Sequence, residues 1–303
     1  MHPVVAASAK AALLATGYYA WRMRRDSLPG VLTLCYHGVR SRSWRHGEPA
    51  FSNLHVSSKT FDGHCRVIAE TCHPITLEWW RQAVAGRRSL PDRPVLVTFD
   101  DGYRSVFETA RPVLRRYRIP AAVFVCTEPI ERQHLFWFDA VARRRGAAAV
   151  VDARRACFTD GRAFPTPRLE PADPEDPLAP LTVEQVKALA DEGFEIGVHT
   201  ATHMPLAGAS PDRQRHELAS CRDALLNWLR SPVNALAYPW GHPGVDYTDE
   251  TVGIVRELGF DVAFTTRPSF ARPGEPALER SRFLVLSEVT PSELAHRMAY
   301  AWR

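Results

Sequence analysis

The feature that most constrains the fold is an alternation of short apolar runs with stretches of helical periodicity. Several runs, such as Ala-Ala-Val-Phe-Val at 121–125, are almost continuously apolar, which is typical of strands buried on both faces. The predicted strands are 31–37, 94–99, 120–126, 194–199, 233–238, 260–265 and 281–286. The predicted helices between them are 60–71, 77–84, 105–117, 183–191, 212–229 and 249–258. This alternation predicts an α/β fold with a parallel sheet, either an incomplete (β/α) barrel of seven strands or a doubly wound open sheet.

The composition indicates an ordinary globular protein, since 45% of the 303 residues are hydrophobic and 24% are charged. The net charge is only +4, and the cationic residues are scattered among acidic ones, so we expect no nucleic-acid partner. The six cysteines form no Cys-x-x-Cys pair. Their spacing favours free buried thiols in a reducing compartment over a disulfide framework.

The first 30 residues are predicted to form a leader that precedes a single domain at 31–303. The apolar stretch at 11–21 is about half of the ~20 residues that a transmembrane helix needs. Arginines follow this stretch, whereas a cleavable secretory signal carries its positive charges before the apolar region. We therefore expect residues 1–27 to form a basic, partly amphipathic helix that either contacts a membrane surface or packs on the domain. The protein is expected to be cytoplasmic or peripheral to the inner membrane.

An insertion at about 127–181 interrupts the alternation of strands and helices. It contains one helical pattern, at 137–145, followed by a proline-rich stretch that we expect to be irregular and extended. The prolines of that stretch are Pro165, Pro167, Pro171, Pro174, Pro177 and Pro180. Because the insertion follows a strand, it emerges at the carboxyl-terminal face of the sheet, where α/β barrels carry their active sites. It either shapes the substrate site or is a surface insertion without a role.

Two motifs at predicted strand ends carry side chains suited to metal-assisted hydrolysis. In the first, Asp100 and Asp101 end an apolar strand, and Gly102 permits a sharp turn after them. In the second, His199 and His203 follow another strand, with a spacing that brings both rings to one side of a helical turn. An aspartate and two histidines from strand ends form a set of metal ligands that leaves positions open for water and substrate.

A third motif, Tyr238-Pro239-Trp240-Gly241, follows the strand at 233–238. A rigid turn at a strand end can present a backbone N–H to a developing oxyanion. The same four residues are equally a common turn.

In this order and spacing, Thr-Phe-Asp-Asp-Gly at 98–102 and His-Thr-x-x-His at 199–203 resemble the polysaccharide deacetylase family. That family is also called the NodB-homology or carbohydrate esterase 4 group, and the resemblance covers roughly residues 31–290. Leu-Cys-Tyr-His-Gly-Val at 34–39 and Leu-Phe-Trp-Phe-Asp at 135–139 look like a branch associated with bacterial exopolysaccharides and surface glycans.

The resemblance implies a distorted (β/α)7 barrel that hydrolyses N-acetyl groups from the amino sugars of a bacterial polysaccharide or glycan precursor. It implies a divalent metal ion, most often Zn²⁺, bound by Asp101, His199 and His203. It maps Asp100 onto the general base and Tyr238 onto the residue whose backbone N–H assists the oxyanion. Trp137 and Trp240 are the candidate substrate-binding residues for an N-acetylhexosamine unit.

Two departures from the family pattern leave roles open. The family has an arginine shortly before the tyrosine motif, where this chain has Asn-Ala-Leu-Ala at 234–237, so Arg280 or Arg282 is a candidate replacement. The family also has a histidine general acid on the last strand, and residues 282–286 contain no histidine. His37 and His242 are the candidate general acids.

Two other functions compete with hydrolysis. A catalytically silent glycan-binding or assembly protein could keep the barrel, and the missing histidine favours that alternative. The intact Asp100 argues against it, because a binding module needs no base. A non-heme iron oxygenase is disfavoured because its metal site is ordinarily built from a His-x-Asp pair, which the two motifs do not contain.

Overall fold

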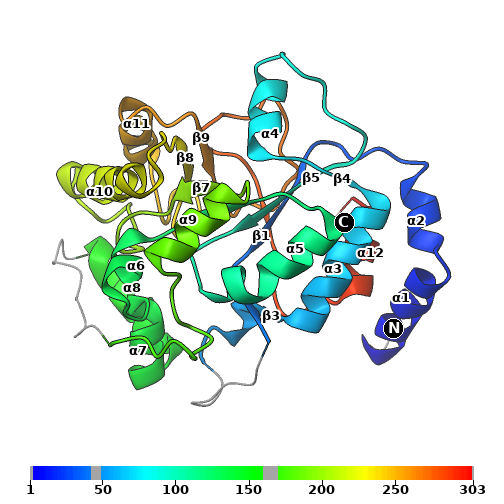
Figure 1. The fold of residues 1–303 in the computed structure, drawn as a ribbon, viewed down its shortest axis with the longest axis horizontal. Coiled ribbons are helices and arrows are strands. Elements are labelled where there is room, and N and C mark those ends of the chain that lie inside the picture. The colour runs from blue at the N-terminus through cyan, green and yellow to red at the C-terminus, as the bar shows by residue number, and fades with distance from the viewer. Residues whose placement is uncertain (1–2, 42–48, 160–169, 302–303) are drawn as a thin grey trace.

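The structure is a computed structural model that describes residues 3–41, 49–159 and 170–301. Its main sheet is parallel, with strand order β10-β1-β5-β6-β7-β8-β9 (Figure 1). These strands are β1 (Leu32–Tyr36), β5 (Pro94–Phe99), β6 (Ala121–Val125), β7 (Glu195–Val198), β8 (Ala235–Ala237), β9 (Val262–Phe264) and β10 (Phe283–Leu284). Short β4 (His73–Pro74) pairs with the start of β5, and β2 (Gly38–Arg40) pairs with β3 (His55–Ser57).

The sheet curls until its two ends nearly meet. β10 pairs with β1, with Phe283 opposite Leu34, and Arg280 forms an isolated parallel bridge to Phe264 in β9. Residues just before and within β10 therefore connect the last strand to the first. The predicted distorted (β/α)7 barrel is confirmed, and all seven predicted strands are present: β5 has the predicted bounds and the other six are shorter.

Helices surround the barrel on the outside (Figure 1). The helices of the described chain are α1 (Pro3–Ala15), α2 (Tyr18–Met23), α3 (Ser58–Thr71), α4 (Leu77–Val84), α5 (Arg111–Tyr117), α6 (Thr127–Arg132), α7 (Trp137–Arg145), α8 (Ala147–Thr159), α9 (Val183–Asp191), α10 (Pro211–Leu229), α11 (Asp249–Glu257) and α12 (Pro291–Ala299). Sequence signals fix several of their starts. The Thr182 hydroxyl accepts the Gln185 N–H, and the Gln185 side chain accepts the Thr182 N–H, which caps α9 from both directions.

The barrel interior is filled by apolar side chains. Leu96 of β5 packs inside with Phe124 and Phe264, whereas its neighbours on β5 face the outer core beneath the helices. Leu77 and Trp80 of α4 belong to the same interior cluster and close the amino-terminal end of the barrel. Side chains alternate between the two faces of a strand, so Asp100, four residues after Leu96, points to the same interior face. Its carboxylate lies at the carboxyl-terminal end of β5.

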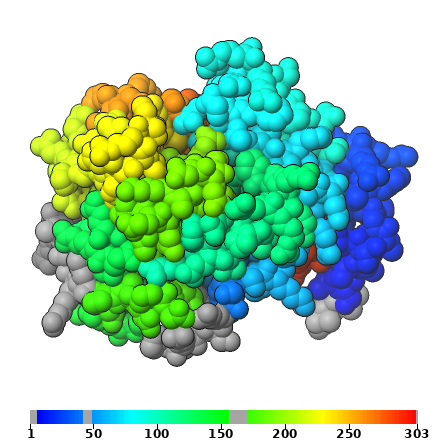
Figure 2. Space-filling view, viewed as in Figure 1, coloured from blue at the N-terminus to red at the C-terminus, as the bar shows by residue number. Residues whose placement is uncertain are grey.

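The leader packs on the domain, which is one of the two expected arrangements. It forms two helices that bend at Gly17 (φ 75°), and both lie against α12 along one flank of the molecule (Figures 1 and 2). Lys10 forms an ion pair with Glu293 at 2.5 Å, and the hydroxyl of fully buried Tyr19 lies 3.0 Å from Nδ1 of His296. Within the described chain, no helix combines the length and apolar character needed to cross a bilayer.

The insertion contains more helix than the sequence predicts. α7 matches the predicted 137–145, but α8 occupies part of the stretch expected to be irregular, so that expectation is wrong for 147–159. The reason is local composition: α8 begins with three alanines, the best helix formers, and the prolines come only after it. Residues 170–181 are irregular, as expected, and Pro165 and Pro167 lie outside the described residues. The five cysteines whose side chains are described are free and buried, and the side chain of Cys157 lies outside the description.

Candidate active site

The candidate catalytic residues meet at the open end of the barrel because each follows a strand. Asp100 and Asp101 follow β5, His199 follows β7, and His37 follows β1. They line one cavity of about 270 Å³. The parallel arrangement of the strands is therefore what brings together residues that are far apart in the sequence.

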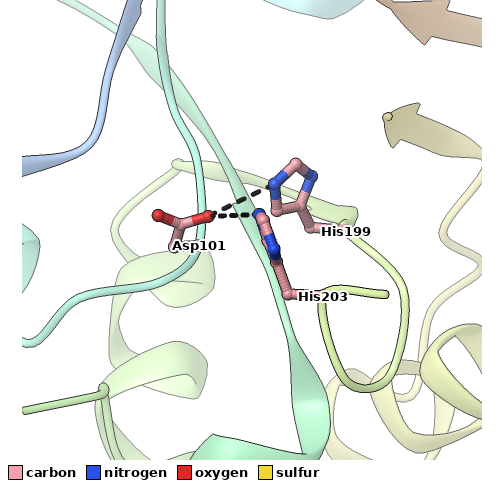
Figure 3. A group of neighbouring side chains, drawn as sticks. All are labelled: Asp101, His199 and His203. Carbon is pink, nitrogen blue, oxygen red and sulfur yellow. Dashed lines mark ion pairs between the residues drawn. The ribbon is translucent and has the colours of Figure 1, made fainter. Parts of the chain in front are cut away.

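Asp101, His199 and His203 form a compact cluster at the base of this cavity (Figure 3). Oδ1 of Asp101 lies 3.3 Å from Nε2 of His199 and 3.2 Å from Nε2 of His203. One potential ligand atom from each of the three lies within 4.8 Å of the other two, and all three side chains are buried. The structure thus brings together the three residues predicted to bind a metal.

The hydrogen bonding of the cluster fits a cation between the three residues. Nδ1 of His199 lies 2.7 Å from the carbonyl oxygen of Ala237, which assigns its hydrogen to Nδ1 and leaves a lone pair on Nε2. That lone pair faces Oδ1 of Asp101, a buried oxygen for which no hydrogen bond is found among the described residues. Facing lone pairs in a buried cluster repel each other unless a cation or a proton lies between them. Carboxylate and imidazole are ligands that Zn²⁺ accepts.

Four of the nine non-glycine residues with positive φ angles in the described chain lie at the same place. Asp101, Thr200, His203 and Trp240 have φ angles of 71°, 64°, 61° and 62°. These values lie in the left-handed region, which non-glycine residues rarely occupy and which costs energy. Such residues persist where the surroundings hold them, and they cluster at functional sites.

Asp100 contacts a different partner from Asp101. Arg282 donates to both of its oxygens, from Nη1 to Oδ1 and from Nη2 to Oδ2, each at 2.7 Å. Both side chains are almost completely buried, and the guanidinium also donates to the carbonyl oxygen of Thr265 at 3.0 Å. The Cys35 thiol donates to Oδ2 of Asp100 at 3.3 Å. Of the two candidate arginines, Arg282 is therefore the one that orients Asp100, whereas Arg280 donates to the carbonyl oxygen of Arg272 at 2.5 Å.

Both carboxyls are ionised at neutral pH. Burial alone would raise the pKa of Asp100, but the Arg282 guanidinium and His199 outweigh burial and lower the pKa below its usual value. Burial likewise opposes the charge of Asp101. The electrostatic interactions with His37 and His203 outweigh burial, so the pKa of Asp101 lies well below its usual range. The two adjacent acids thus stay charged through different neighbours.

Buried polar contacts hold the loop that carries the two histidines. Oε2 of Glu217, on α10, accepts the backbone N–H and the hydroxyl of Thr202, each at 3.0 Å. The Trp137 indole donates to the carbonyl oxygen of His203 at 3.2 Å. Trp137 is buried and is not among the residues that line the cavity, so it is placed to support His203. This position differs from the prediction, which was that Trp137 contacts a sugar.

The residue expected to supply an oxyanion N–H is also in a different place. The backbone N–H of Tyr238 donates to the carbonyl oxygen of Phe264 at 3.0 Å, as part of the pairing between β8 and β9. Its side chain is buried, stacks on Tyr247 and donates to the carbonyl oxygen of Leu278. The prediction for Tyr238 is therefore wrong, because Tyr238 directly follows β8 and its N–H continues the hydrogen bonding with β9. Trp240, two residues later, lines the cavity, and no described residue accepts a hydrogen bond from its N–H.

Both candidate general acids line the cavity, in different surroundings. His37 is half-buried, and its Nδ1 has no hydrogen-bond partner in the described chain. It is also close enough for its charge to influence the pKa of Asp101. The His242 side chain is 61% exposed, and its Nδ1 lies 2.9 Å from Oδ2 of Asp246. The sequence did not predict roles for Glu217 and Asp246. Their contacts, with Thr202 and with Arg154 respectively, follow no sequence motif.

Aromatic rings form one wall of the cavity. The Trp240 ring lies 5.5 Å from the His203 ring, 6.0 Å from Phe138 and 6.2 Å from Phe51, measured between centroids. Phe51, Phe138 and Trp240 all line the cavity. The Trp240 side chain is partly exposed, and an indole ring that lines a cavity can stack on the apolar face of a sugar ring, which is the role predicted for it.

Comparison with known sequences finds relatives that are named as deacetylases. The profile of a family described as "Polysaccharide deacetylase" matches residues 87–263. YxkH of Bacillus subtilis (strain 168), whose name describes a polysaccharide deacetylase, is 24% identical over 252 residues, which cover 82% of this chain and 70% of the relative. Poly-beta-1,6-N-acetyl-D-glucosamine N-deacetylase of Staphylococcus aureus is 26% identical over 123 residues, which cover 38% of this chain and 42% of that enzyme.

Solved structures share the fold. The Streptococcus pyogenes deacetylase PplD, in complex with acetate, superposes with a TM-score of 0.66 and 22% identity, over 90% of this chain and 99% of that one. IcaB from Ammonifex degensii gives a TM-score of 0.64 and 24% identity, over 89% of this chain and 97% of that one. Both identities are below 25%, so these comparisons show a shared fold alone.

Proposed function

Because the chain belongs to the polysaccharide deacetylase family, whose members remove N-acetyl groups from carbohydrates, we propose that it is a metal-dependent N-deacetylase of a bacterial polysaccharide or glycan precursor. The observation that carries this proposal is the cluster of Asp101, His199 and His203 beside an ionised Asp100 in one cavity. The substrate unit is an N-acetylhexosamine. The Staphylococcus aureus relative, named for poly-beta-1,6-N-acetyl-D-glucosamine, supports this choice.

The proposed metal ligands are Asp101, His199 and His203, and the proposed ion is Zn²⁺. Such an ion, when bound, polarises the acetyl carbonyl and lowers the pKa of water. The hydrogen bond between Nδ1 of His199 and Ala237 keeps Nε2 available as a ligand atom. The contacts of Glu217 with Thr202 and of Trp137 with His203 hold the loop at 199–203, which carries both histidine ligands.

Asp100 is the proposed general base, which takes a proton from the attacking water. Its two hydrogen bonds with Arg282 fix the plane of the carboxylate, and its lowered pKa keeps it unprotonated at neutral pH. His37 is the proposed general acid that protonates the departing amine. Its place in the cavity, close enough to affect Asp101, supports this assignment over His242, whose Nδ1 contacts Asp246.

Trp240 takes the role that the sequence assigned to Tyr238. Its backbone N–H, left without an acceptor in the described chain, is the proposed donor to the tetrahedral oxyanion. Its ring is the proposed platform for the sugar. A silent binding protein needs neither an oriented base nor an oxyanion donor, so these features favour hydrolysis over the glycan-binding alternative.

The test of this function is acetate release from a β-1,6-linked tetramer of N-acetylglucosamine, with and without a chelator. Asp100→Asn should keep its metal and lower kcat roughly 10²–10⁴-fold, the usual contribution of general acid–base catalysis. Asp101→Asn should lose metal and activity together, and excess Zn²⁺ should restore part of the activity. Metal content and turnover are measured side by side for both variants.

The two variants control for each other, because they differ by one position and make the same chemical change. If Asp100→Asn loses its metal while Asp101→Asn keeps it, the two roles are reversed. If both variants release acetate at the normal rate, the hydrolase proposal is wrong.

We also propose that the protein works in the cytoplasm or at the inner face of the membrane. Four positive residues of the leader, Lys10, Arg22, Arg24 and Arg25, equal the net charge of the whole chain, and Trp21 is 49% exposed. Basic and aromatic residues of this kind are attracted to anionic lipid surfaces. Cell fractionation tests the proposal, and activity in a periplasmic fraction with a shortened N-terminus would contradict it.

A further inference from the structure

A second cluster of charged side chains lies beside the cavity and includes none of the proposed metal ligands. Its centre is Asp246, whose side chain is fully buried. Oδ2 of Asp246 accepts hydrogen bonds from the backbone N–H and from Nδ1 of His242, both at 2.9 Å. Its Oδ1 accepts a hydrogen bond from Arg154. The carbonyl oxygen of Asp246 also accepts the N–H groups of Leu206 and Ala207, which follow the histidine loop.

Arg154 connects this cluster to the aromatic wall. It lies on α8, the helix of the insertion that the sequence did not predict. Its guanidinium pairs with Asp246 and also lies 4.8 Å from the centroid of the Trp240 ring. One side chain from the insertion thus contacts the residue that holds His242 and the ring that lines the cavity.

The energetics of this arrangement make Arg154 important to both neighbours. Asp246 is a buried carboxylate, and removal of a cationic partner from a buried pair is strongly destabilising. Without that partner, Asp246 would be left as an unpaired buried charge, and its contact with His242 would be less firmly held. A cation over an indole face also restricts the ring to one orientation. His242 and Trp240 both line the cavity that contains Asp100.

We propose that Arg154 is a positioning residue of the sugar-binding site, which holds Trp240 and, through Asp246, His242 at the cavity mouth. This inference rests on the proposed deacetylase function. It assigns α8 of the insertion a role, because Arg154 contacts Trp240, which lines the cavity together with Phe138 of the same insertion. Arg154 takes no part in metal binding or in proton transfer.

The test compares the kinetics of Arg154→Gln and Arg154→Lys on the β-1,6-linked N-acetylglucosamine tetramer. Arg154→Gln should raise KM about tenfold with kcat within about twofold, because it loosens contacts made equally in the ground and transition states. Arg154→Lys keeps the charge opposite Asp246 and should recover part of the loss. Asp246→Asn should raise KM in the same direction. Zn²⁺ content should equal that of the wild type in all three variants.

The matched control is Arg155→Gln, the same change at the next position of α8, where the side chain is exposed. It should leave KM and kcat unchanged. An Arg154→Gln enzyme with wild-type KM, or one that loses kcat and metal together, would overturn the positioning role. If the wild type itself releases no acetate, the proposed function fails, and this inference fails with it.

Discussion

The leader and the insertion are the two segments outside the strand–helix alternation, and they have different relations to the active site. They lie towards opposite ends of the long axis of the molecule, α1 and α2 at one end and α6 to α8 towards the other (Figure 1). The leader contacts α12 on the outside of the barrel, and none of its described residues lines the catalytic cavity. The insertion supplies Phe138 to the cavity, Trp137 to the histidine loop and Arg154 to the rim. Changes in the insertion should therefore alter catalysis, whereas changes in the leader should alter stability alone.

The largest effect is expected for Trp137→Ala. Truncation of a buried tryptophan costs about 3–5 kcal/mol of unfolding free energy, and here it also removes the indole donor to His203. The variant should unfold earlier in denaturant and retain less Zn²⁺ than the wild type. The control is Trp21→Ala in the leader, where the ring is 49% exposed, with an expected change of about 0.5 kcal/mol or less. Equal effects at the two tryptophans would remove the distinction between the segments.

A pH-dependent effect is expected for Asp139→Asn in α7. Burial raises the pKa of Asp139 to about 8, although the Tyr103 hydroxyl donates to its carboxyl at 2.7 Å. The folded state therefore keeps a proton that the unfolded state releases near pH 4, so stability decreases as pH rises from about 4 to about 8. The amide side chain of the variant cannot ionise, so the variant should lack this decrease. Unfolding free energies at pH 5 and pH 9 measure it, and parallel pH curves for both proteins would contradict the assignment.

A smaller effect, confined to stability, is expected for Tyr19→Ala in the leader. The ring is completely buried against α12, and its removal should cost about 2–3 kcal/mol of unfolding free energy. The kcat/KM of the variant should stay within about twofold of the wild type. Tyr19→Phe is the control, since it keeps the ring and loses only the contact with His296, worth about 1 kcal/mol. A large fall in kcat/KM would show that the leader does influence the site.

The smallest effect is expected for Lys10→Ala. The ion pair with Glu293 is partly exposed to solvent, and pairs of this kind contribute about 0.2–1 kcal/mol. Stability should fall within that range at low salt and approach the wild-type value at high salt, because salt screens the attraction. A salt-independent loss of several kcal/mol would mean that α1 is held mainly by this one contact.

The barrel and the convergence of the metal-binding candidates could be predicted because both depend on local patterns. Apolar runs mark the strands, and residues that follow parallel strands meet at one end of the barrel. The sequence left the choice between Arg280 and Arg282 open, since the two alternate along one segment. Packing decides it, because Arg282 reaches Asp100 whereas Arg280 does not.

Other features depended on information that a linear pattern does not carry. Tyr238 was a poor choice because its N–H belongs to the pairing of β8 with β9, and strand pairing at the level of one residue was not predictable. Arg154 and Glu217 act through contacts between distant segments, which leave no spacing signal. Helix α8 was not predicted, because the prolines that follow it from Pro165 onwards suggested irregular structure for the whole stretch after 145.

The pairing of Asp100 with Arg282 has a consequence for how the protein is made. The two residues are 182 positions apart, so a chain that emerges from the ribosome exposes Asp100 long before its partner is synthesised. Tyr19 is likewise synthesised long before its partner His296, and β1 long before its neighbour β10, which lies near the end of the chain. An unfinished chain therefore contains both catalytic motifs without an oriented base. Translation must be nearly complete before Arg282 can pair with Asp100.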